Sequence, residues 1–510
     1  MLSKVWSAAT LGIDAVRITI EVDAGTGQPG FTLVGLPDTA VREAYARVRS
    51  ALANCGLFLP PRHITVNLSP ADVKKEGSAY DLPIAVGILH AGEFLRNEHV
   101  AGRVFIGELS LDGAVTPIRG ALSISAALAG DTEARELIVP AANANEAAAV
   151  ESVRVVGAAH LLSLLAHLRG ERLLPAASSS SVRTCHLDCA DFADVRGQAQ
   201  AKRALEVAAA GGHNILMIGP PGSGKTMLAK RLSGILPRLT GEEAIVTTQI
   251  HSVAGVLPPG SGLVTERPFR APHHTISTAG LAGGGSYPRP GEVSLAHHGV
   301  LFLDELAEFR RDTLEVLRQP MEDGKVAIAR AARTVTFPAS FTLAAALNPC
   351  PCGFFNHPSR ECICTPQQIA RYLAKISGPL LDRIDLQVEV PALKGEEIAS
   401  LAGGEPSSSI RERVERARCL QRERFVRQRI RCNAEMNSRA MRKFCELDAA
   451  SRKLLLAAIE RLGLSARAHD RILKVARTIA DLAAEERIGS GHVAEAIHYR
   501  ALDRGYFRNG

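Results

Sequence analysis

The stretch Gly219-Pro220-Pro221-Gly222-Ser223-Gly224-Lys225-Thr226 is a complete G-x-x-x-x-G-K-[ST] phosphate-binding loop. The apolar run 215–218 before it indicates a buried strand, and residues 227–232 after it indicate a helix. The glycines let successive backbone N–H groups converge on phosphates, and the helix N-terminus favours negative charge there. Lys225 supplies a cation for the phosphates, and Thr226 supplies a hydroxyl for Mg²⁺. The stretch therefore predicts an α/β domain that binds ATP and Mg²⁺, rather than a simple glycine-rich turn.

Two later apolar runs end in polar residues that suit the same site. Residues 299–303 are followed by Asp304, expected to hold Mg²⁺ through water, and by Glu305, expected to polarise the attacking water. Residues 341–347 end at Asn348, whose amide could touch the γ-phosphate or orient water; an ordinary Asn-Pro turn is the alternative. Phosphoryl transfer needs positioning and charge neutralisation more than covalent chemistry, so this set predicts ATP hydrolysis.

Bulk composition limits the classes of protein to which the chain can belong. Its 510 residues suffice for three or four domains, and a hydrophobic fraction of 46% argues against wholesale disorder. The net charge of +7 favours a polyanionic partner without proving one. The first residues lack the order of a signal peptide, and no apolar run is long enough to span a membrane, so we expect a cytoplasmic protein. Its ten cysteines should then be reduced or metal-bound.

One compact C-x-C-x₉-C-x-C constellation contains four of these cysteines: Cys350, Cys352, Cys362 and Cys364. Four soft ligands in one loop suit tetrahedral Zn²⁺, and His357 inside the loop could replace one of them. A bound metal would lock the loop directly behind Asn348. Reduced thiols in an ordinary loop are the alternative. The adjacent histidines at 273–274 and 297–298 point in opposite directions within each pair, so we favour hydrogen bonding over metal binding for them.

Further stretches carry a resemblance to a known family: FTLVGLPD (31–38), VNLSPAD (66–72), EGSAYDLP (76–83), RPFRAPHH (267–274), GEVSLAHH (291–298), PCPCG (349–353) and GPLLDRID (378–385). With them the chain resembles the YifB/ComM group of magnesium-chelatase-like AAA+ ATPases over nearly its whole length. The resemblance implies an α/β fold, in which an AAA+ P-loop core with a helical lid follows a Lon-protease-like α/β domain. It also implies a homo-oligomeric, hexameric ring that works as a helicase on single-stranded, forked or junction DNA.

The resemblance and the composition together divide the chain into a Lon-like domain (1–168), a linker (169–189), the AAA+ core (190–395) and the lid (396–510). Residues 249–290 resemble the helix-2 insertion of the clade, and residues 321–337 resemble the hairpin before sensor 1. Both elements project into the central pore in that clade. Lys325, Arg330 and Arg333 would then contact DNA phosphates without reading sequence; a solvated basic hairpin is the alternative.

Two arginines receive roles from the resemblance. Arg383 resembles the arginine finger, which reaches across a subunit boundary and neutralises charge on the neighbour's γ-phosphate. Arg467 resembles the sensor-2 arginine of the lid, and Arg471, one turn further on, is the second choice. On local grounds alone, Arg383 could equally pair with an adjacent aspartate on a surface turn. A finger that acts in trans requires an oligomer.

The Lon-like region lacks the Ser/Lys dyad of that protease family. Ala79 occupies the nucleophile position, Ser78 lies one residue away, and Leu122 stands where the lysine base would be. A serine hydroxyl without a neighbouring amine is a poor nucleophile at neutral pH, so we expect no peptidase activity. Near the other end of the chain, residues 411–431 contain nine arginines and three glutamates. This run predicts either a solvated lid helix or an arm that contacts DNA or a neighbouring subunit.

The motifs and the resemblance together imply a ring-forming ATPase that couples hydrolysis to DNA translocation. The resemblance implies that its activity is branch migration in recombination during natural transformation. Two alternatives remain. One is a magnesium-chelatase-like motor that acts on a protein or metal-insertion partner; the fused Lon-like domain argues against it. The other is an ATP-gated regulatory scaffold; the intact Asp304, Glu305 and Arg383 argue against it.

Overall fold

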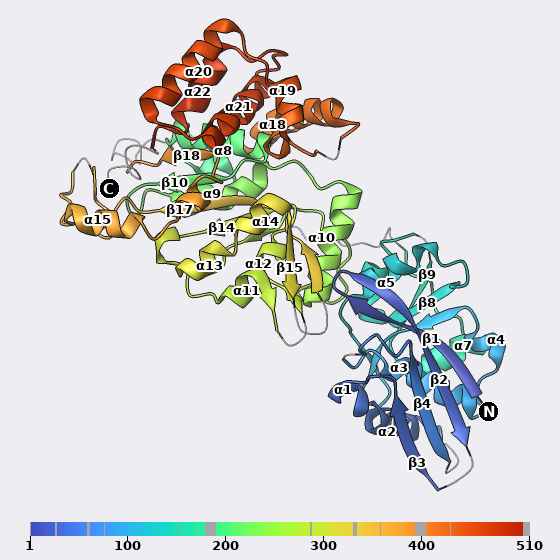
Figure 1. The fold of residues 1–510 in the computed structure, drawn as a ribbon. Helices are drawn as coiled ribbons and strands as arrows, with labels where there is room; N and C mark the ends of the chain where they lie inside the picture. The colour runs from blue at the N-terminus through green and yellow to red at the C-terminus, as the bar shows by residue number, and fades with distance from the viewer. Residues whose placement is uncertain are drawn as a thin grey trace.

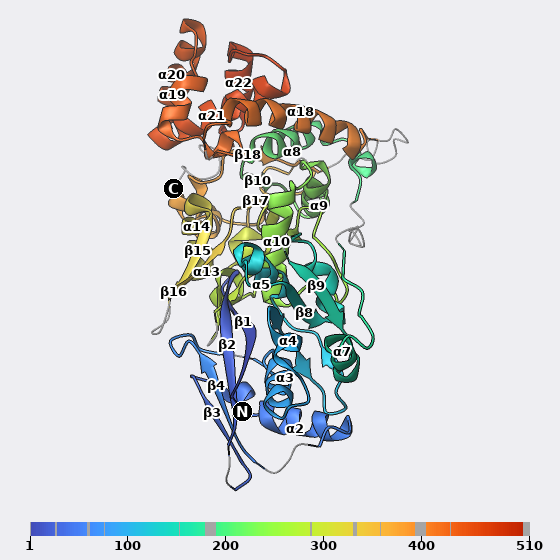
Figure 2. The ribbon, with the colours of Figure 1, turned by 90° about the vertical axis from the view of Figure 1, so that its right-hand side faces the viewer.

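The computed structural model describes residues 2–25, 28–58, 62–75, 77–151, 153–178, 190–285, 288–329, 334–357, 359–392, 404–428 and 430–502. An N-terminal α/β domain, a central α/β core and a helical lid follow one another along the long axis of the molecule (Figure 1, Figure 2). This arrangement confirms the predicted fold class. None of the described helices combines the length and the apolar character that crossing a membrane requires.

A seven-stranded sheet in the order β3-β4-β2-β1-β5-β8-β9 forms the N-terminal domain. Its strands are β1 (Leu2–Leu11), β2 (Asp14–Gly25), β3 (Gly30–Val34), β4 (His63–Ser69), β5 (Arg103–Phe105), β8 (Glu136–Pro140) and β9 (Arg154–Ala158); β6 (Glu108–Leu109) and β7 (Val115–Thr116) form a separate ribbon. Its helices are α1 (Thr39–Arg42), α2 (Ala44–Asn54), α3 (Asp81–Ala91), α4 (Asn97–Val100), α5 (Ala121–Ala127), α6 (Ala144–Ala147) and α7 (Leu161–Leu168). Ile18, Ile20 and Val22 alternate along β2 and are fully buried, because one face of the strand packs on the core.

The core is a five-stranded parallel sheet in the order β11-β14-β17-β10-β18. Its strands are β10 (Ile215–Ile218), β11 (Phe269–Arg270), β14 (Val300–Leu303), β17 (Thr342–Leu347) and β18 (Leu386–Glu389). Ile215 and Met217 pack in one hydrophobic cluster, whereas Leu216 and Ile218 pack in another on the opposite face. Burial on both faces explains why these strands appear in the sequence as continuous apolar runs.

Nine helices of the described core accompany this sheet: α8 (Ala199–Gly211), α9 (Lys225–Ile235), α10 (Gly241–Ala254), α11 (Thr278–Ala282), α12 (Glu292–Leu295), α13 (Arg311–Glu315), α14 (Arg318–Asp323), α15 (Pro366–Leu373) and α16 (Gly378–Leu381). Two antiparallel ribbons lie outside the sheet, β12 (Gly283–Gly284) with β13 (Arg289–Pro290), and β15 (Lys325–Ala329) with β16 (Thr334–Pro338). The second ribbon is the hairpin expected before sensor 1. The expected DNA contacts Arg330 and Arg333 lie outside the described residues, and Lys325 is exposed at the first position of β15.

The lid contains α18 (Ser407–Phe425), α19 (Ser438–Phe444), α20 (Ala449–Leu462), α21 (Ala466–Leu482) and α22 (Ser490–His498). Its apolar residues belong to the same hydrophobic cluster as α8, α9 and one face of the core sheet. The lid is therefore packed directly on the core. In Figure 1 the lid covers the end of the core farthest from the N-terminal domain.

The N-terminal domain contacts residues 249–290, the expected insertion, which begins within the last turns of α10. The backbone N–H of Gly120 donates to Ser252 Oγ over 3.0 Å, and Asn145 Nδ2 donates to the carbonyl of Gly260 over 3.0 Å. Ile13, in the turn between β1 and β2, packs against the hydrophobic cluster that contains the hairpin β15–β16. The insertion and the hairpin are thus both held against the N-terminal domain.

Candidate nucleotide site

The phosphate loop connects β10 to α9 at the carboxyl edge of the core sheet. Gly222 and Gly224 have φ angles of 77° and 91°, a left-handed conformation that side chains rarely adopt, so glycine is required at both positions. Lys225 is buried, and its Nζ donates to the carbonyl of Gly219 at 2.7 Å and to Asn348 Oδ1 at 3.2 Å. Asn348 follows β17, the neighbour of β10 in the sheet. The predicted Lys225 and Asn348 therefore meet.

The predicted magnesium ligands also meet. Thr226 Oγ1, at the start of α9, donates to Asp304 Oδ2 over 2.6 Å. Asp304 directly follows β14, which pairs with β17 on the side away from β10. A hydroxyl and a carboxylate are oxygen ligands of the kind that Mg²⁺ prefers, so the donor set fits this ion.

Glu305 adopts a left-handed backbone conformation with φ of 51°. This conformation is uncommon for a residue with a side chain and is concentrated at functional sites. The Glu305 side chain is about half exposed, and Oε2 lies 3.5 Å from His274 Nδ1. Its carboxylate is therefore open to water beside the Thr226–Asp304 pair.

Burial strongly affects the lysine of the phosphate loop. Desolvation lowers the pKa of Lys225 to about 8, although the charges of Asp304 and Glu305 oppose this shift. Without a bound nucleotide, burial therefore makes the protonated form of Lys225 less favourable than it is in water. A phosphate beside Nζ would favour the charged form.

The four clustered cysteines lie beside this site, with Sγ atoms all within 4.8 Å of one another. The Sγ–Sγ distances are 3.3 Å from Cys350 to Cys352, 3.7 Å from Cys350 to Cys362, and 3.6 Å from Cys352 to Cys362. A tetrahedral zinc with Zn–S bonds of about 2.3 Å gives edges of about 3.8 Å, close to these values. The backbone N–H groups of Cys352 and Phe355 donate to the Sγ atoms of Cys364 and Cys350. Hydrogen bonds to the ligand sulfurs orient thiolates toward a metal, so the cluster fits one metal ion.

The cysteine loop also contacts the phosphate loop. Gly353 has a φ of 83°, and a Cβ at this position would lie 2.5 Å from Cδ of Pro221. His357 is engaged elsewhere, because its Nδ1 accepts from the backbone N–H groups of Ser359 and Arg360. The cysteine loop therefore supports the phosphate loop from one side, and its four sulfurs gather without the histidine.

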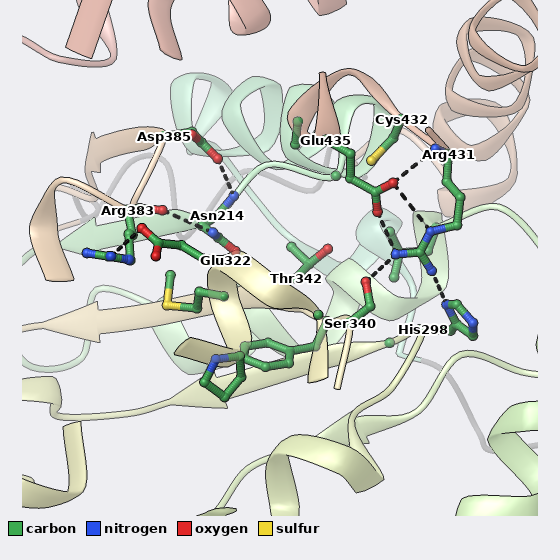
Figure 3. Close-up of a pocket in the computed structure, with 18 of the residues that line it drawn as sticks. Asn214, His298, Glu322, Ser340, Thr342, Arg383, Asp385, Arg431, Cys432 and Glu435 are labelled. Atoms are coloured by element: carbon green, nitrogen blue, oxygen red, sulfur yellow. Dashed lines mark hydrogen bonds and ion pairs between the residues drawn. The ribbon is translucent and has the colours of Figure 1, made fainter. Parts of the chain in front are cut away.

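A second site lies at the opposite edge of the same sheet, in a cavity of 540 Å³ between the core and the lid (Figure 3). Asn214, Thr342 and Asp385 line it, and each stands at or just before the amino end of a core strand. Arg383, predicted as the finger, is only 7% exposed and lines this cavity beside Glu322. Its Nη1 donates to the carbonyl of Pro379 over 2.6 Å. The finger thus lies across the sheet from its own phosphate loop.

Six basic side chains line this cavity: Arg267, Arg383, Arg418, Arg431, Arg471 and Lys474. Arg471, the second choice for sensor 2, donates to Asp385, and its Nη1 also lies 3.3 Å from the carbonyl of Arg383. Arg467 is exposed at the start of α21 and does not line the cavity. Sequence reasoning missed Arg267, Arg418, Arg431 and Lys474. The dense arginine run at 411–431 was a signal for Arg418 and Arg431, and the motif at 267–274 was one for Arg267.

The histidine pairs do not gather a metal site among the described residues. Burial, followed by the charges of Arg431 and Arg267, lowers the pKa of His298 to about 3. Its Nδ1 lies 2.7 Å from Arg431 Nη1 and serves as a hydrogen-bond acceptor. The hydrogen-bonding role predicted for these histidines is the one that the structure gives His298.

In the N-terminal domain, Ser78 donates to Glu108 Oε2, and Leu122 is fully buried on α5. The buried amine of Lys75 donates to the carbonyl of Pro70 instead of to Ser78. These contacts agree with the missing dyad, and the absence of peptidase activity stays a prediction.

Three family models match the chain in succession. "Subunit ChlI of Mg-chelatase" matches residues 20–143, "Magnesium chelatase, subunit ChlI" matches 191–398, and "Magnesium chelatase, subunit ChlI C-terminal" matches 404–500. The chain is 47% identical to competence protein ComM of Haemophilus influenzae, over 99% of this chain and 98% of that protein. It is 45% identical to YifB of Salmonella typhimurium, over 99% and 98% respectively. Lon protease 2 of Bacillus subtilis is 30% identical over 148 residues, 26% of each chain.

Proposed function

The chain belongs to the ComM/YifB family of magnesium-chelatase-like AAA+ proteins, and from this premise we propose that it is a ring-forming ATPase that moves along DNA. One observation carries the proposal. The cis half of an ATPase site, with Lys225 and Asn348, gathers at one edge of the core sheet, while Arg383 lies at the other edge. Two such protomers side by side would complete one site.

Within one protomer, Lys225 would bind the β- and γ-phosphates, and Asn348 would contact the γ-phosphate. Thr226 and Asp304 would hold Mg²⁺, which neutralises charge on the phosphates. Glu305 would accept a hydrogen bond from the attacking water and direct it at the γ-phosphate. Its exposed carboxylate next to the Thr226–Asp304 pair supports this role.

Arg383 would supply the remaining positive charge from the neighbouring protomer. Such a contact is head-to-tail, and head-to-tail contacts form a ring when the rotation between protomers closes; a homo-hexamer is the ring that we propose. Arg467 lies on the exposed surface of the lid. Its sensor-2 role stays a proposal beside that of Arg471. The cavity between the core and the lid, which we call the trans cavity, is lined by Arg471 and not by Arg467, and this favours Arg471.

DNA is proposed as the substrate on two grounds. The relative named for competence is similar to this chain over nearly the full length of both proteins, and the chain has a net charge of +7. The hairpin carries Lys325 at its exposed base, with Arg330 and Arg333 as further proposed phosphate contacts. Branch migration during recombination in natural transformation, in the cytoplasm, is the specific activity that we propose.

We also propose that the four clustered cysteines hold one structural Zn²⁺. The Sγ–Sγ distances and the N–H donors to sulfur support this assignment. The metal would stiffen the loop that contacts the phosphate loop through Gly353.

The test is the ATP hydrolysis rate with and without forked DNA at two salt concentrations, followed by movement of a four-way junction. We expect stimulation by DNA that weakens as salt rises, because phosphate contacts release counterions. Hydrolysis without any response to DNA would overturn the translocase and favour a motor for another partner. Nucleotide binding without turnover would favour the ATP-gated scaffold.

A further inference from the structure

The base of the hairpin β15–β16 is closed by a short segment on each side. Glu322 lies near the end of α14, two residues before Gly324, and Ser340 lies two residues after β16. The backbone N–H of Ala339 donates to the carbonyl of Gly324 over 2.8 Å and ties the two sides together. A displacement of either side at this base is therefore transmitted to the hairpin.

Both sides of this base are held by arginines that line the trans cavity (Figure 3). Arg383 Nη2 donates to Glu322 Oε1 on one side. Arg431 Nη2 donates to Ser340 Oγ on the other side, and the same guanidinium contacts Glu435 and His298. The cavity expected to face a neighbouring protomer is thus also the attachment point of the hairpin.

The guanidinium of Arg383 is only partly used. Nη1 is held by the carbonyl of Pro379 and Nη2 by Glu322, but Nε, although buried, has no partner among the described residues. Arginine binds carboxylate or phosphate most strongly through two parallel N–H donors. In this chain Arg270 uses Nε and Nη2 together to hold the two oxygens of Glu292. On Arg383 the same pair of donors is half occupied by Glu322.

A phosphoryl group that takes Nε and Nη2 of Arg383 together competes with Glu322 for Nη2. Glu322 is able to leave, because its side chain is 54% exposed whereas that of Arg383 is 8% exposed. The carboxylate that leaves belongs to the base of the hairpin. Binding of a phosphoryl group by Arg383 would therefore weaken the hold on one side of the hairpin base.

We propose that Glu322 is a positioning residue, which holds Arg383 in a protomer that contacts no neighbouring nucleotide. When Arg383 binds the terminal phosphoryl group of the neighbour's nucleotide, Glu322 is displaced from Arg383 and one side of the hairpin base is freed. The inference rests on the proposed function, since it requires Arg383 to act in trans. It assigns to Glu322 the coupling between nucleotide state and hairpin position. Glu322 itself touches no reacting atom.

Glu322→Gln tests the proposal, because it keeps the shape of the side chain and removes its charge. The ATP concentration for half-maximal hydrolysis should fall about five-fold, the factor that a partly exposed ion pair is worth, and the DNA-free rate should rise. The response to forked DNA should shrink, since the hairpin base is already released. Asp323→Asn is the matched control, because Asp323 is the next residue, lines the same cavity and contacts Gln319 rather than Arg383.

A double-mutant cycle separates the effect of the Glu322–Arg383 contact from a general structural effect of the substitution. Because Arg383→Ala should remove most hydrolysis, the cycle is measured as ATP affinity in a fluorescent-nucleotide titration. Glu322→Gln should tighten ATP binding in the wild-type background and leave it unchanged in the Arg383→Ala background. An equal change in both backgrounds would overturn the proposal, as would a Glu322→Gln protein that matches Asp323→Asn in all three readouts. The outcomes for the proposed function are distinct. A wild-type protein that ignores DNA would refute the translocase, while the cycle with Arg383 could still succeed in nucleotide binding without DNA.

Discussion

Replacing Arg383 with alanine removes the guanidinium that lies across the sheet from its own phosphate loop. The fold should survive the substitution. It leaves the carbonyl of Pro379 and the half-exposed carboxylate of Glu322 without their arginine partner, and this loss costs about 1–3 kcal/mol of folding free energy. A domain of ordinary stability, about 5–15 kcal/mol, tolerates this cost. Hydrolysis should fall far more, since an arginine finger contributes about 10³- to 10⁵-fold to turnover. The rate loss should therefore far exceed any loss of folded protein.

Mixing separates a finger in trans from a residue that acts within its own protomer. Glu305→Gln should bind ATP without hydrolysing it, because the variant keeps Lys225 and Asp304 but lacks the carboxylate that directs water. In a ring assembled from equal amounts of Arg383→Ala and Glu305→Gln protomers, about a quarter of the head-to-tail interfaces contain an intact Glu305 and an intact Arg383. If interfaces act independently, about a quarter of wild-type activity should return.

The assay is phosphate release at saturating Mg²⁺ and ATP with forked DNA, measured for each variant alone and for mixtures across the full range of ratios. Arg416→Ala is the control, since this exposed lid arginine donates, among the residues that the structure describes, to the carbonyl of Glu412 in its own helix. A mixture no more active than the better single variant would refute the trans assignment. So would an Arg383→Ala protein that retains more than a tenth of the wild-type rate.

Three further predictions concern the cis site and the loop beside it. The pKa of Lys225 is lowered to about 8, and bound phosphate favours its charged form. Because Lys225 loses its proton between pH 7 and pH 9, ATP affinity should fall about ten-fold over this range in a fluorescent-nucleotide titration. Lys225→Arg should show no such fall. Gly353→Ala should weaken ATP binding, because its Cβ would clash with the proline of the phosphate loop, whereas Gly491→Ala, with open space around it, should not; equal affinities would refute the contact. Cys362→Ser should abolish the single equivalent of zinc measured by elemental analysis, whereas Cys419→Ser, at an exposed lone cysteine, should retain it; a wild-type protein without zinc would contradict the metal assignment.

The cis half of the site could be predicted from sequence because its parts are encoded locally. Each polar residue directly follows an apolar run, and parallel strands bring their carboxyl ends to one edge. Asp304 and Asn348 therefore had to approach the phosphate loop once the three runs paired. The cysteine cluster was predictable for a similar reason, since all four thiols come from one short segment.

The trans cavity was not predictable, because its contacts join segments far apart in the chain. Nothing local links Glu322 to Arg383, which meet only when the core folds, or Arg431 to Ser340, which meet only when the lid packs on the core. The choice between Arg467 and Arg471 shows the same limit. The two are one helical turn apart, and only the position of α21 places Arg471 in the cavity and leaves Arg467 exposed.

The geometry of the core sheet also bears on whether one protomer could work alone. Its carboxyl edge carries the phosphate loop, and its amino edge carries the cavity that contains Arg383. At about 3.3 Å per residue, the four residues of β10 and the six of β17 separate these edges by about 13–20 Å of fully buried strand. No side chain spans such a thickness, and a closing motion of the lid leaves the sheet between the two edges unchanged. If Arg383 contributes to hydrolysis at all, it does so at the nucleotide of a neighbour, and a monomer that hydrolyses ATP at the normal rate would have to do so without it.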